Sequence, residues 1–346
     1  MGKYTIRDIA KKAGVSHTTV SLVLNSKNNR VSQATKDKVI AIAKEMNYSP
    51  NQIAVSLATK KTFTLGIILP NLINTHFSAI ASGVQSYAQS QGYSVFLCNT
   101  NESVEKCIAY VNEFVNRNMD GFVLIPPALI NENGDNEKLY ATLEECEIPY
   151  VLVEHAVLHL FHDFVTIDNR SGGYIATEHL LELNHKKIGC ITGPRTEIGA
   201  KRRFRGYKEA LADYSIEFQK DFVYNGDYSF NSGIEGGKNL IEKGVTAIFC
   251  CNDLMALGVN KAAAGLGMKI PEQLSIVGFD QNPICEYLNI PLTTISQPSI
   301  AMGKKACEIL LDGIEDSEEF QRDYYFSPTL IVRNSTAVCP NIKDAD

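Results

Sequence analysis

The sequence predicts an α/β protein, in which an N-terminal three-helix domain precedes two lobes that each contain a doubly wound parallel sheet. From residue 64 onward, short apolar runs rich in Val, Ile and Phe alternate with helical stretches, as in parallel strands covered by helices on both faces. Residues 1–61 show helical periodicity only. With 346 residues, the chain is also too long for one compact core, so several domains are expected.

Charge is distributed unevenly between these two parts. Residues 1–61 hold 11 of the 33 basic residues and three of the 39 acidic ones, a net charge of +8, whereas the rest of the chain carries −14. A small basic domain joined to an acidic body indicates that only the basic domain approaches a polyanion. A solvated basic surface is the alternative that charge alone leaves open.

The composition indicates a cytoplasmic protein without a membrane partner. The first residues, MGKYTIRDIAKKAG, lack the apolar core of a signal peptide, and no run of about 18 apolar residues could cross a bilayer. The nine cysteines are scattered and form no CxxC pair, which is typical of reduced thiols rather than a disulfide framework.

Three helices are expected in the basic domain, over residues 6–13, 17–24 and 33–46. Their N-termini can be capped by Thr5, Ser16 and Ser32, and Gly14 supplies the first turn. The apolar positions that would face inward are Ile6, Ile9, Ala10, Ala13, Val20, Val23, Leu24, Val39, Ile42, Ala43 and Met46. This arrangement is a helix-turn-helix, whose second helix would enter the major groove of DNA.

The outer face of that second helix is small and polar, which suits the edges of bases. His17, Thr18 and Thr19 lie at its N-terminal end, nearest the bases. Phosphate contacts, which give affinity without sequence choice, are expected from Lys3, Arg7, Lys27, Arg30, Lys36 and Lys38.

The segment TIRDIAKKAGVSHTTVSLVLN, with VSQATKDKVIAIAKEMNYSPNQIAVSLATKKT after it, resembles the DNA-binding headpiece of the lac/galactose repressor family. The resemblance implies a bacterial transcriptional regulator, expected to be a repressor and not an enzyme, that binds palindromic operator DNA as a homodimer. In that family the residues at the positions of His17 and Thr18 choose the operator sequence. Leu22 departs from the family, where arginine is common, and would contact either a thymine methyl group or the DNA backbone. The predicted DNA-binding residues are Thr5, Ser16, His17, Thr18, Thr19, Ser21, Leu22, Asn25, Arg30, Asn51, Ala54 and Leu57.

Residues 49–61 follow as a hinge segment. Pro50 favours a helix start, and residues 51–58 could form two turns, which are too short to be stable alone. By resemblance this is the family's hinge helix, which orders in the minor groove as a pair, with Leu57 wedged between the central base pairs. The alternative is a plain linker in which Leu57 packs on the body.

In the body, the residues that follow each apolar run are candidates for a ligand site, because doubly wound sheets bind ligands at the carboxyl ends of their strands. These residues are 71–77, 99–101, 154–155, 193–203, 252–253 and 280. They combine amides, carboxylates and a guanidinium with aromatic rings, which is typical of carbohydrate sites. The body also resembles the periplasmic-binding-protein-like (type I) core of the same family.

The resemblance to that core implies a small-molecule effector, expected to be a carbohydrate, bound between the lobes. The predicted effector-binding residues are His76, Phe77, Arg203, Tyr228, Asn252, Asp253 and Asp280. Five of them have a structural alternative: Arg203 lies in a charge run that fits a solvated helix face, Asp280 could cap the helix that follows, Asn252 could serve its turn, and the two aromatics could be core.

Other effectors and other protein classes are less favoured. Purine sensors of the family carry arginine nine residues before the position of Gly206, where this chain has Glu197. The segment GDYSFNSGIE also occurs in the family's catabolite regulators, so control by a protein corepressor is the main alternative. A sugar receptor of a transporter would need a secretion signal, and the sequence has no P-loop, GxSxG, GxGxxG or HExxH motif of an enzyme.

No metal or cofactor is expected. In EHAVLHLFHDF, His155, His159 and His162 fall at helical spacing, which imitates a zinc site. Large apolar residues are interleaved with them, and the resemblance places a connection between lobes here.

The predicted domains are 1–48 (helix-turn-helix), 49–61 (hinge), 62–161 with 296–324 (first lobe), 162–295 with 325–340 (second lobe) and 341–346 (tail). The dimer face is expected on residues 77–89 and around 95–115. Because the C-terminus has no heptad-rich segment, we expect a dimer rather than a tetramer.

Overall fold

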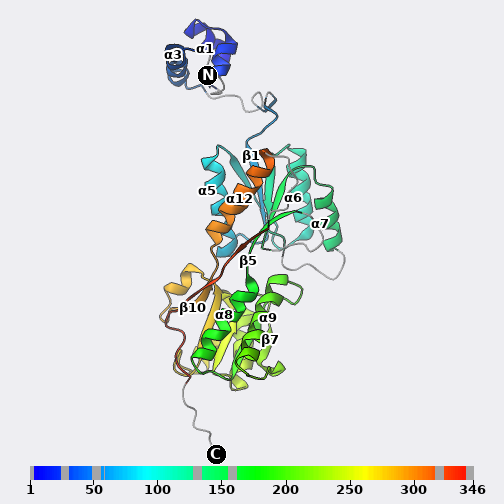
Figure 1. Cartoon of the computed structure of the whole chain (residues 1–346), viewed down its shortest axis with the longest axis vertical. Coiled ribbons are helices and arrows are strands. Elements are labelled where there is room, and N and C mark those ends of the chain that lie inside the picture. Colours follow the sequence, from blue (N-terminus) through cyan, green and yellow to red (C-terminus); the bar gives the residue numbers. More distant parts are fainter. Residues whose placement is uncertain are drawn as a thin grey trace, which may run out of the picture. The chain divides into compact units, whose positions relative to one another are not determined.

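The computed structural model describes residues 4–24, 31–48, 56–57, 59–127, 135–154, 162–315 and 323–339. The chain divides into two compact units, residues 1–63 and 64–346 (Figure 1). No helix in the described part of the chain is long and apolar enough to cross a membrane.

The first unit contains α1 (Ile6–Ala13), α2 (His17–Leu24) and α3 (Gln33–Glu45). These bounds confirm the predicted helices, although α3 ends one residue earlier than expected. Gly14 follows α1 in the left-handed conformation with φ of 70°. The fully buried Ile9, Val20 and Val39 bring the three helices onto one small core.

Side chains at the helix starts satisfy backbone groups that would otherwise lack partners. The N–H of Thr19 donates to Ser16 Oγ at 3.0 Å, and that of Thr35 donates to Ser32 Oγ at 3.4 Å. At α1 the carboxylate of Asp8 accepts from both the backbone N–H and the hydroxyl of Thr5, each at 2.8 Å. These bonds lower the pKa of Asp8.

The first lobe of the second unit is built on a six-stranded sheet in the order β11-β5-β4-β3-β1-β2. Its strands are β1 (Thr64–Leu69), β2 (Ser94–Asn99), β3 (Gly121–Leu124), β4 (Tyr150–Val153), β5 (Asp163–Ile167) and β11 (Asp323–Phe326), all parallel. Helices α5 (Thr75–Ser90) and α12 (Ser299–Glu315) pack together, as do α6 (Val104–Asn116) and α7 (Asp135–Glu144). Figure 1 shows these two pairs on opposite faces of the sheet.

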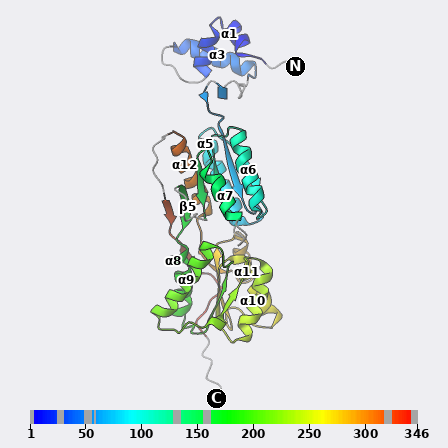
Figure 2. The same cartoon turned by 90° about the vertical axis from the view of Figure 1, so that its right-hand side faces the viewer.

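The second lobe repeats this plan with the strand order β12-β10-β9-β8-β6-β7. Its strands are β6 (Ile188–Thr192), β7 (Val223–Asn225), β8 (Ala247–Cys250), β9 (Ser275–Asp280), β10 (Thr293–Ser296) and β12 (Thr329–Ile331), of which only β12 is antiparallel among the strands described. Helices α8 (Asn169–Glu182) and α9 (Ile198–Asp213) lie on one side, and α10 (Phe230–Glu242) and α11 (Asp253–Gly265) on the other (Figure 2). Short 3-10 turns, η1 (Lys220–Phe222) and η2 (Pro283–Glu286), complete the lobe.

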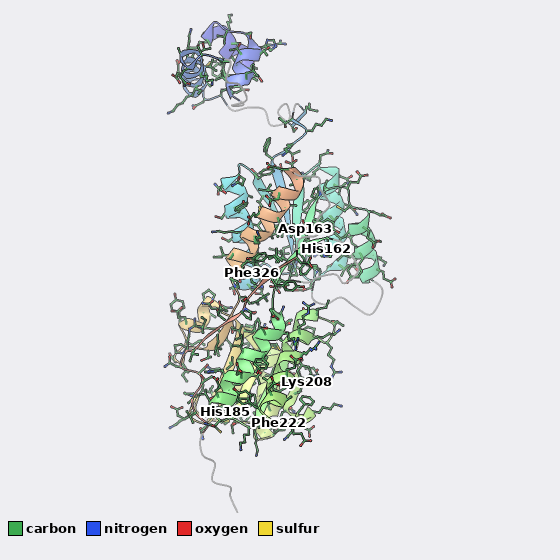
Figure 3. The ribbon with its side chains drawn as sticks, viewed as in Figure 1. His162, Asp163, His185, Lys208, Phe222 and Phe326 are labelled. Atoms are coloured by element: carbon green, nitrogen blue, oxygen red, sulfur yellow. The ribbon has the colours of Figure 1, made fainter. Side chains whose placement is uncertain are left out.

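Two predicted lobe boundaries are wrong by a few residues. Residues 163–167 were expected in the second lobe, but they form β5, which pairs with β4 of the first sheet. Tyr325 and Phe326 likewise belong to β11, which pairs with β5 (Figure 3). The chain therefore passes between the sheets after β5, after β10 and after β11. The boundaries differ because β5 and β11 are short strands next to the segments that connect the lobes, and nothing in the sequence of such a strand indicates which sheet it joins.

Reciprocal glycines bring three helix pairs into backbone contact. A Cβ on Gly206 of α9 would lie 2.0 Å from the carbonyl oxygen of Arg170, and one on Gly173 of α8 would lie 2.0 Å from that of Arg203. Equivalent pairs are Gly83 with Gly303, between α5 and α12, and Gly233 with Gly258, between α10 and α11. No side chain larger than hydrogen fits at these contacts.

Candidate nucleic-acid interface and ligand site

The outer face of α2 presents the side chains that the sequence singles out. His17 and Thr18 are exposed, whereas Val20 and Val23 on the opposite face are buried in the three-helix core. Because Ser16 Oγ and Thr19 Oγ1 are 2.8 Å apart and bonded to each other, these two hydroxyls form the helix cap. The helix therefore offers His17 and Thr18 to a partner from a rigid N-terminal turn.

The remaining predicted DNA contacts differ in exposure, and several lie outside the described residues. Ser21 and Leu22 are half-buried on α2, and the Thr5 hydroxyl donates to Asp8. Leu57 is described, and its side chain is 80% exposed. The other predicted contacts, Asn25, Arg30, Asn51 and Ala54, lie outside the described residues, as does most of the predicted hinge helix.

In the second unit, Arg203 is the centre of a buried polar network. Its side chain is 7% exposed; Nε donates to Asn169 Oδ1 at 2.7 Å and Nη1 to the carbonyl of Cys251 at 2.5 Å. The guanidinium lies 3.7 Å from the centre of the Phe279 ring, and Nη1 lies 3.8 Å from Asp280 Oδ1. Arg203 therefore does not lie on the solvated face of its helix, because the helix turns it toward the ends of β8 and β9.

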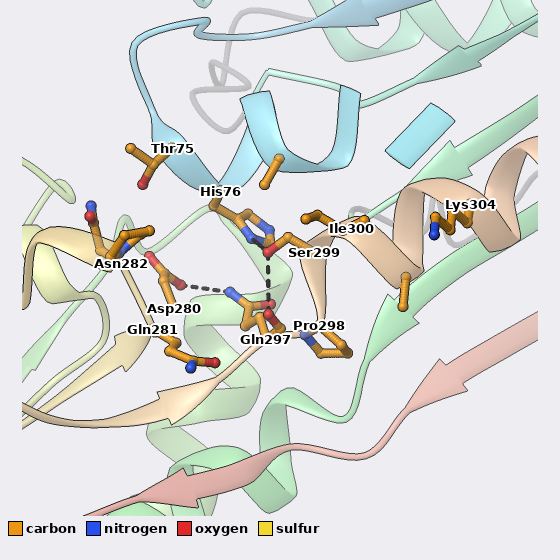
Figure 4. Close-up of a pocket in the computed structure, with 13 residues that line it drawn as sticks. Thr75, His76, Asp280, Gln281, Asn282, Gln297, Pro298, Ser299, Ile300 and Lys304 are labelled. Carbon is orange, nitrogen blue, oxygen red and sulfur yellow. Dashed lines mark hydrogen bonds between the residues drawn. The ribbon is translucent and has the colours of Figure 1, made fainter. Parts of the chain in front are cut away.

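A cavity of 430 Å³ opens between the lobes beside this network. His76, at the start of α5, and Asp280, at the end of β9, both line it, together with Gln297 and Ser299 from the segment that leads into α12 (Figure 4). Gln297 donates to Asp280 at 2.6 Å, while the two ring nitrogens of His76 bond Ser299 Oγ and Glu154 Oε1, each at 2.8 Å. Burial raises the pKa of Asp280, and the charges of Arg203 and His76 partly offset that rise.

Tyr228 and Asn252 lie on the second lobe's side of this network. The Tyr228 hydroxyl donates to Glu197 at 2.7 Å, and burial and the neighbouring Glu197 both raise the pKa of Tyr228. Asn252 caps α11 by accepting from Met255 N–H at 2.9 Å, and its amide donates to the carbonyl of Tyr228 at 3.1 Å. Asn252 is therefore the cap of α11, a structural role that the sequence suggested for Asp280, and the same side chain also contacts Tyr228.

Backbone conformation marks the same residues. Glu154, Tyr228 and Asp280 have φ values of 71°, 68° and 115°, in the left-handed region that residues other than glycine rarely adopt. Such strained residues gather at binding and catalytic sites, where the surrounding structure holds them in place. These three follow β4, precede α10 and end β9, so the strain lies at strand and helix ends next to the network.

Asp253 is placed differently from its predicted role. Its side chain is 1% exposed and does not line the described cavity. One carboxylate oxygen accepts from the Asn282 N–H and the other from the Thr294 hydroxyl, each at 2.6 Å. Asp253 thus holds the loop after β9, and with it Asp280, in position. Its assignment as a direct ligand contact is not supported, because the first residue of α11 turns toward β10 and not toward the lobe junction.

The burial of Asp253 gives a pH prediction. Burial and the nearby Asp280 raise the pKa of Asp253 from 3.8 to about 8, so the folded chain keeps a proton that the unfolded chain releases above pH 4. The contribution to stability is complete at low pH and is lost at about 1.4 kcal/mol per unit as the pH rises toward 8. In the variant Asp253→Asn, the amide oxygen can accept from the Asn282 N–H and the amide nitrogen can donate to the Thr294 hydroxyl oxygen, so the variant should keep two contacts and lack this slope. Urea unfolding at pH 6 and 7.5 should show the wild type losing about 2 kcal/mol more than the variant. Equal losses would contradict the shift.

Several site residues lay outside the predicted set. Asn169 and Gln297 follow β5 and β10, and Glu154 follows β4, so the same rule of strand ends points to them. Glu154 and Glu197 fall in the candidate ranges 154–155 and 193–203, but neither was assigned as an effector contact. Phe77 is half-buried and packs on His76, with ring centres 5.4 Å apart, but it does not line the described cavity.

Of the three histidines in the segment EHAVLHLFHDF, only His162 lies among the described residues. His155 and His159 lie outside the described residues. His162 is 8% exposed, and its ring stacks on that of Tyr150 at a centre-to-centre distance of 6.2 Å. Aromatic packing therefore accounts for the position of His162.

Comparison with known proteins agrees with both units. The profile of the bacterial regulatory proteins of the lacI family matches residues 5–51, and that of a periplasmic binding protein-like domain matches residues 177–336. The transcriptional repressor PurR of Vibrio campbellii is 35% identical over 96% of this chain and 98% of its own length. PurR of Aliivibrio salmonicida has the same identity and coverage.

Solved structures give the same result. The lac repressor dimer bound to operator and the anti-inducer ONPF has a TM-score of 0.83 at 27% identity, covering 97% of this chain and 100% of its own. The regulator CelR in complex with cellobiose has a TM-score of 0.72 at 28% identity, covering 96% and 100%. These relatives are transcriptional regulators and not enzymes, which confirms the prediction that this chain is not an enzyme. The chain belongs to the lacI family of bacterial regulatory proteins and is a DNA-binding transcriptional regulator.

Proposed function

We propose that this regulator represses transcription as a homodimer on a palindromic operator, and that a sugar bound between the lobes changes its affinity for DNA. The observation that carries the effector part is the polar network of Arg203, Asp280 and His76, which meets at a cavity between the carboxyl ends of both sheets. A ligand that contacts both lobes can favour one relative orientation of them over another. A differential affinity of about 1–3 kcal/mol would change operator occupancy about 5–150-fold.

A hydroxylated ligand fits the chemistry of this network. Asp280 and Gln297 offer an acceptor and a donor side by side, Arg203 offers a fixed fork of donors, and Tyr228 supplies an aromatic face. Glu197, which bonds Tyr228, adds a further acceptor near the ring. The CelR and Enterococcus faecium structures that resemble this chain contain cellobiose and ribose, respectively. We favour these small-molecule precedents over control by a protein corepressor, because both sugars are bound to regulators that this chain resembles.

The first lobe offers a surface for dimerisation. Strand β2 is at the edge of its sheet, and on it Phe96 and Leu97 are 51% and 44% exposed. Exposed apolar edge strands are normally covered by a partner or blunted by charge. A second copy on this edge lies within the predicted dimer face at residues 95–115 and would present two α2 helices to one duplex. We place the regulator in the cytoplasm, where a bacterial operator lies.

Operator binding tests this function. Using duplexes selected by the wild-type chain from a random library, we expect His17→Ala and Thr18→Ala to reduce discrimination between related sequences by about 1–3 kcal/mol per lost base contact. Lys36→Ala should weaken all sequences alike and lower the slope of log K against log salt by about 1. Gel-shift titrations at two salt concentrations measure both effects.

A duplex that carries only one half of the palindrome is the matched control. A duplex with a single half-site should bind far more weakly than the full palindrome if two copies act together. Equal affinity for both duplexes would contradict the dimer. Equal losses of discrimination in the His17, Thr18 and Lys36 variants would show that α2 does not read bases.

A further inference from the structure

A second cavity of 480 Å³ lies in the second lobe, between α9 and the segment that runs from η1 into β7. We call it the basic groove and define it by Arg195, Lys201, Phe204, Lys208, Phe218 and Lys220, which line it. Figure 3 shows Lys208 on the flank of this lobe, well away from the junction with the first lobe. The volume is within the roughly 300–1,000 Å³ that small-molecule sites occupy.

The charge of the groove is one-sided. Four cations line it and no carboxylate does, although the body outside residues 1–61 carries a net charge of −14. Within the described part of the chain, Lys201, Lys208 and Lys220 form no ion pair, in contrast to Arg170 and Arg205, which share Glu209. Arg195 is held in place by a bond of 2.9 Å from its Nε to Asn225 Oδ1. Cations kept close together without counter-charges favour an anionic ligand.

Two aromatic rings form the apolar wall. Phe204 and Phe218 meet edge to face with ring centres 6.0 Å apart, and Phe218 is 40% exposed. Lys208 Nζ lies 5.1 Å from the centre of the Phe204 ring. A flat ring can stack on the exposed face of Phe218 while the lysines contact an attached anion.

The groove is distinct from the site between the lobes but shares α9 with it. Lys201, Phe204 and Lys208 recur along one face of that helix, whereas Arg203 points from another face into the polar network. Gly193 separates the two, since a Cβ there would meet the Tyr228 ring at 2.3 Å while the residue itself lines the groove. A ligand in the groove therefore contacts the helix that carries Arg203.

We propose that the basic groove binds a nucleotide, with the base on Phe218 and the phosphates between Lys201, Lys208 and Lys220. Four cations exceed what a neutral sugar requires, and an inorganic anion alone would leave the aromatic wall unused. This ligand is additional to the proposed effector, which occupies the cavity lined by His76 and Asp280.

Fluorescence titration of the full chain with N-methylanthraniloyl-ADP tests the proposal. We expect saturable binding at low salt, competed by ADP more strongly than by adenosine or pyrophosphate. The double variant Lys201→Ala/Lys208→Ala should raise the Kd of the probe at least about tenfold, which corresponds to about 1.4 kcal/mol, and so should the single variant Phe218→Ala. Lys238→Ala, which removes an exposed lysine of α10 outside the groove, should bind like the wild type.

The variant Asp280→Asn separates this site from the one between the lobes. It should leave the binding of the probe unchanged, even if it abolishes sugar binding. Loss of the probe in Asp280→Asn with retention in Lys201→Ala/Lys208→Ala would overturn the proposal, because the nucleotide would then lie between the lobes. Absence of binding, or equal competition by pyrophosphate and ADP, would also overturn it. If the double variant unfolds, Lys220→Glu repeats the test, because it replaces one positive charge of the groove by a negative one and should also weaken probe binding.

Discussion

Replacing Arg203 by methionine is expected to abolish ligand binding between the lobes while the three-helix domain still binds operator DNA. Arg203 donates two hydrogen bonds inside the second lobe and carries the positive charge that faces Asp280. Without it, Asp280 is a buried carboxyl that lacks its cationic partner, and the loss of one member of a buried pair typically costs about 3–5 kcal/mol. We therefore expect the affinity for the effector to fall at least about 100-fold.

Calorimetry with a panel of mono- and disaccharides measures this effect, and a gel shift in the presence of the bound sugar measures the response. Arg202→Met is the matched control, because its side chain is the neighbouring cation of α9 and lines none of the described cavities. Thermal unfolding of each variant shows whether the lobe remains folded. If the Arg203→Met chain is folded and binds sugar as tightly as the wild type, the guanidinium of Arg203 does not contribute to ligand binding. A panel with no binder to the wild type would contradict a sugar effector.

The second large effect is expected for Gly206→Ala, which should destabilise the second unit by about 3 kcal/mol, at the upper end of what overpacking costs. The new Cβ would lie 2.0 Å from the carbonyl oxygen of Arg170 and 2.5 Å from the backbone nitrogen of Tyr174. Both atoms belong to the backbone of α8, so no rotamer change can relieve the overlap and the two helices must separate. Urea unfolding followed by circular dichroism gives the change in free energy.

Gly265→Ala is the control for this substitution. Gly265 also lies within a helix, α11, but nothing approaches its ideal Cβ position within 4 Å. There alanine should be neutral or stabilise the chain by up to about 1 kcal/mol, because it reduces the entropy of the unfolded state. If both variants lose the same stability, the close contact between α8 and α9 is not the cause.

The sequence predicted most of the local structure because the relevant signals are local. Ser16, Ser32 and Gly14 act within one turn of their own helices, so the three helices were predicted almost to the residue. The glycine pairs between helices were not predicted, since a glycine that permits contact with another helix leaves no pattern in the residues next to it. The partner of β5 was missed for the same reason.

The site was predicted in part by the rule that parallel strands present ligands at their carboxyl ends. That rule, with the family resemblance, led to Arg203, Tyr228 and Asp280, which the structure brings into one network. It could not separate Asn252, which contacts the Tyr228 carbonyl, from Asp253, which holds the loop after β9, because adjacent residues at a helix start point about 100° apart and only packing decides where each side chain lies. Asn169 and Gln297 were missed although they obey the rule, since amides after strands also serve as caps. Glu154 was among the candidates that the rule selected, but it was not assigned as an effector contact.

The three passages of the chain between the sheets have a consequence for how such proteins can be altered. Each lobe takes its last strand, β11 or β12, from the end of the chain, so neither lobe is one continuous stretch of sequence. A single cut in the backbone at the junction leaves two covalent connections intact. Recombination that exchanges one lobe between relatives must therefore replace two separate gene segments at once, whereas the N-terminal unit can be exchanged with a single breakpoint.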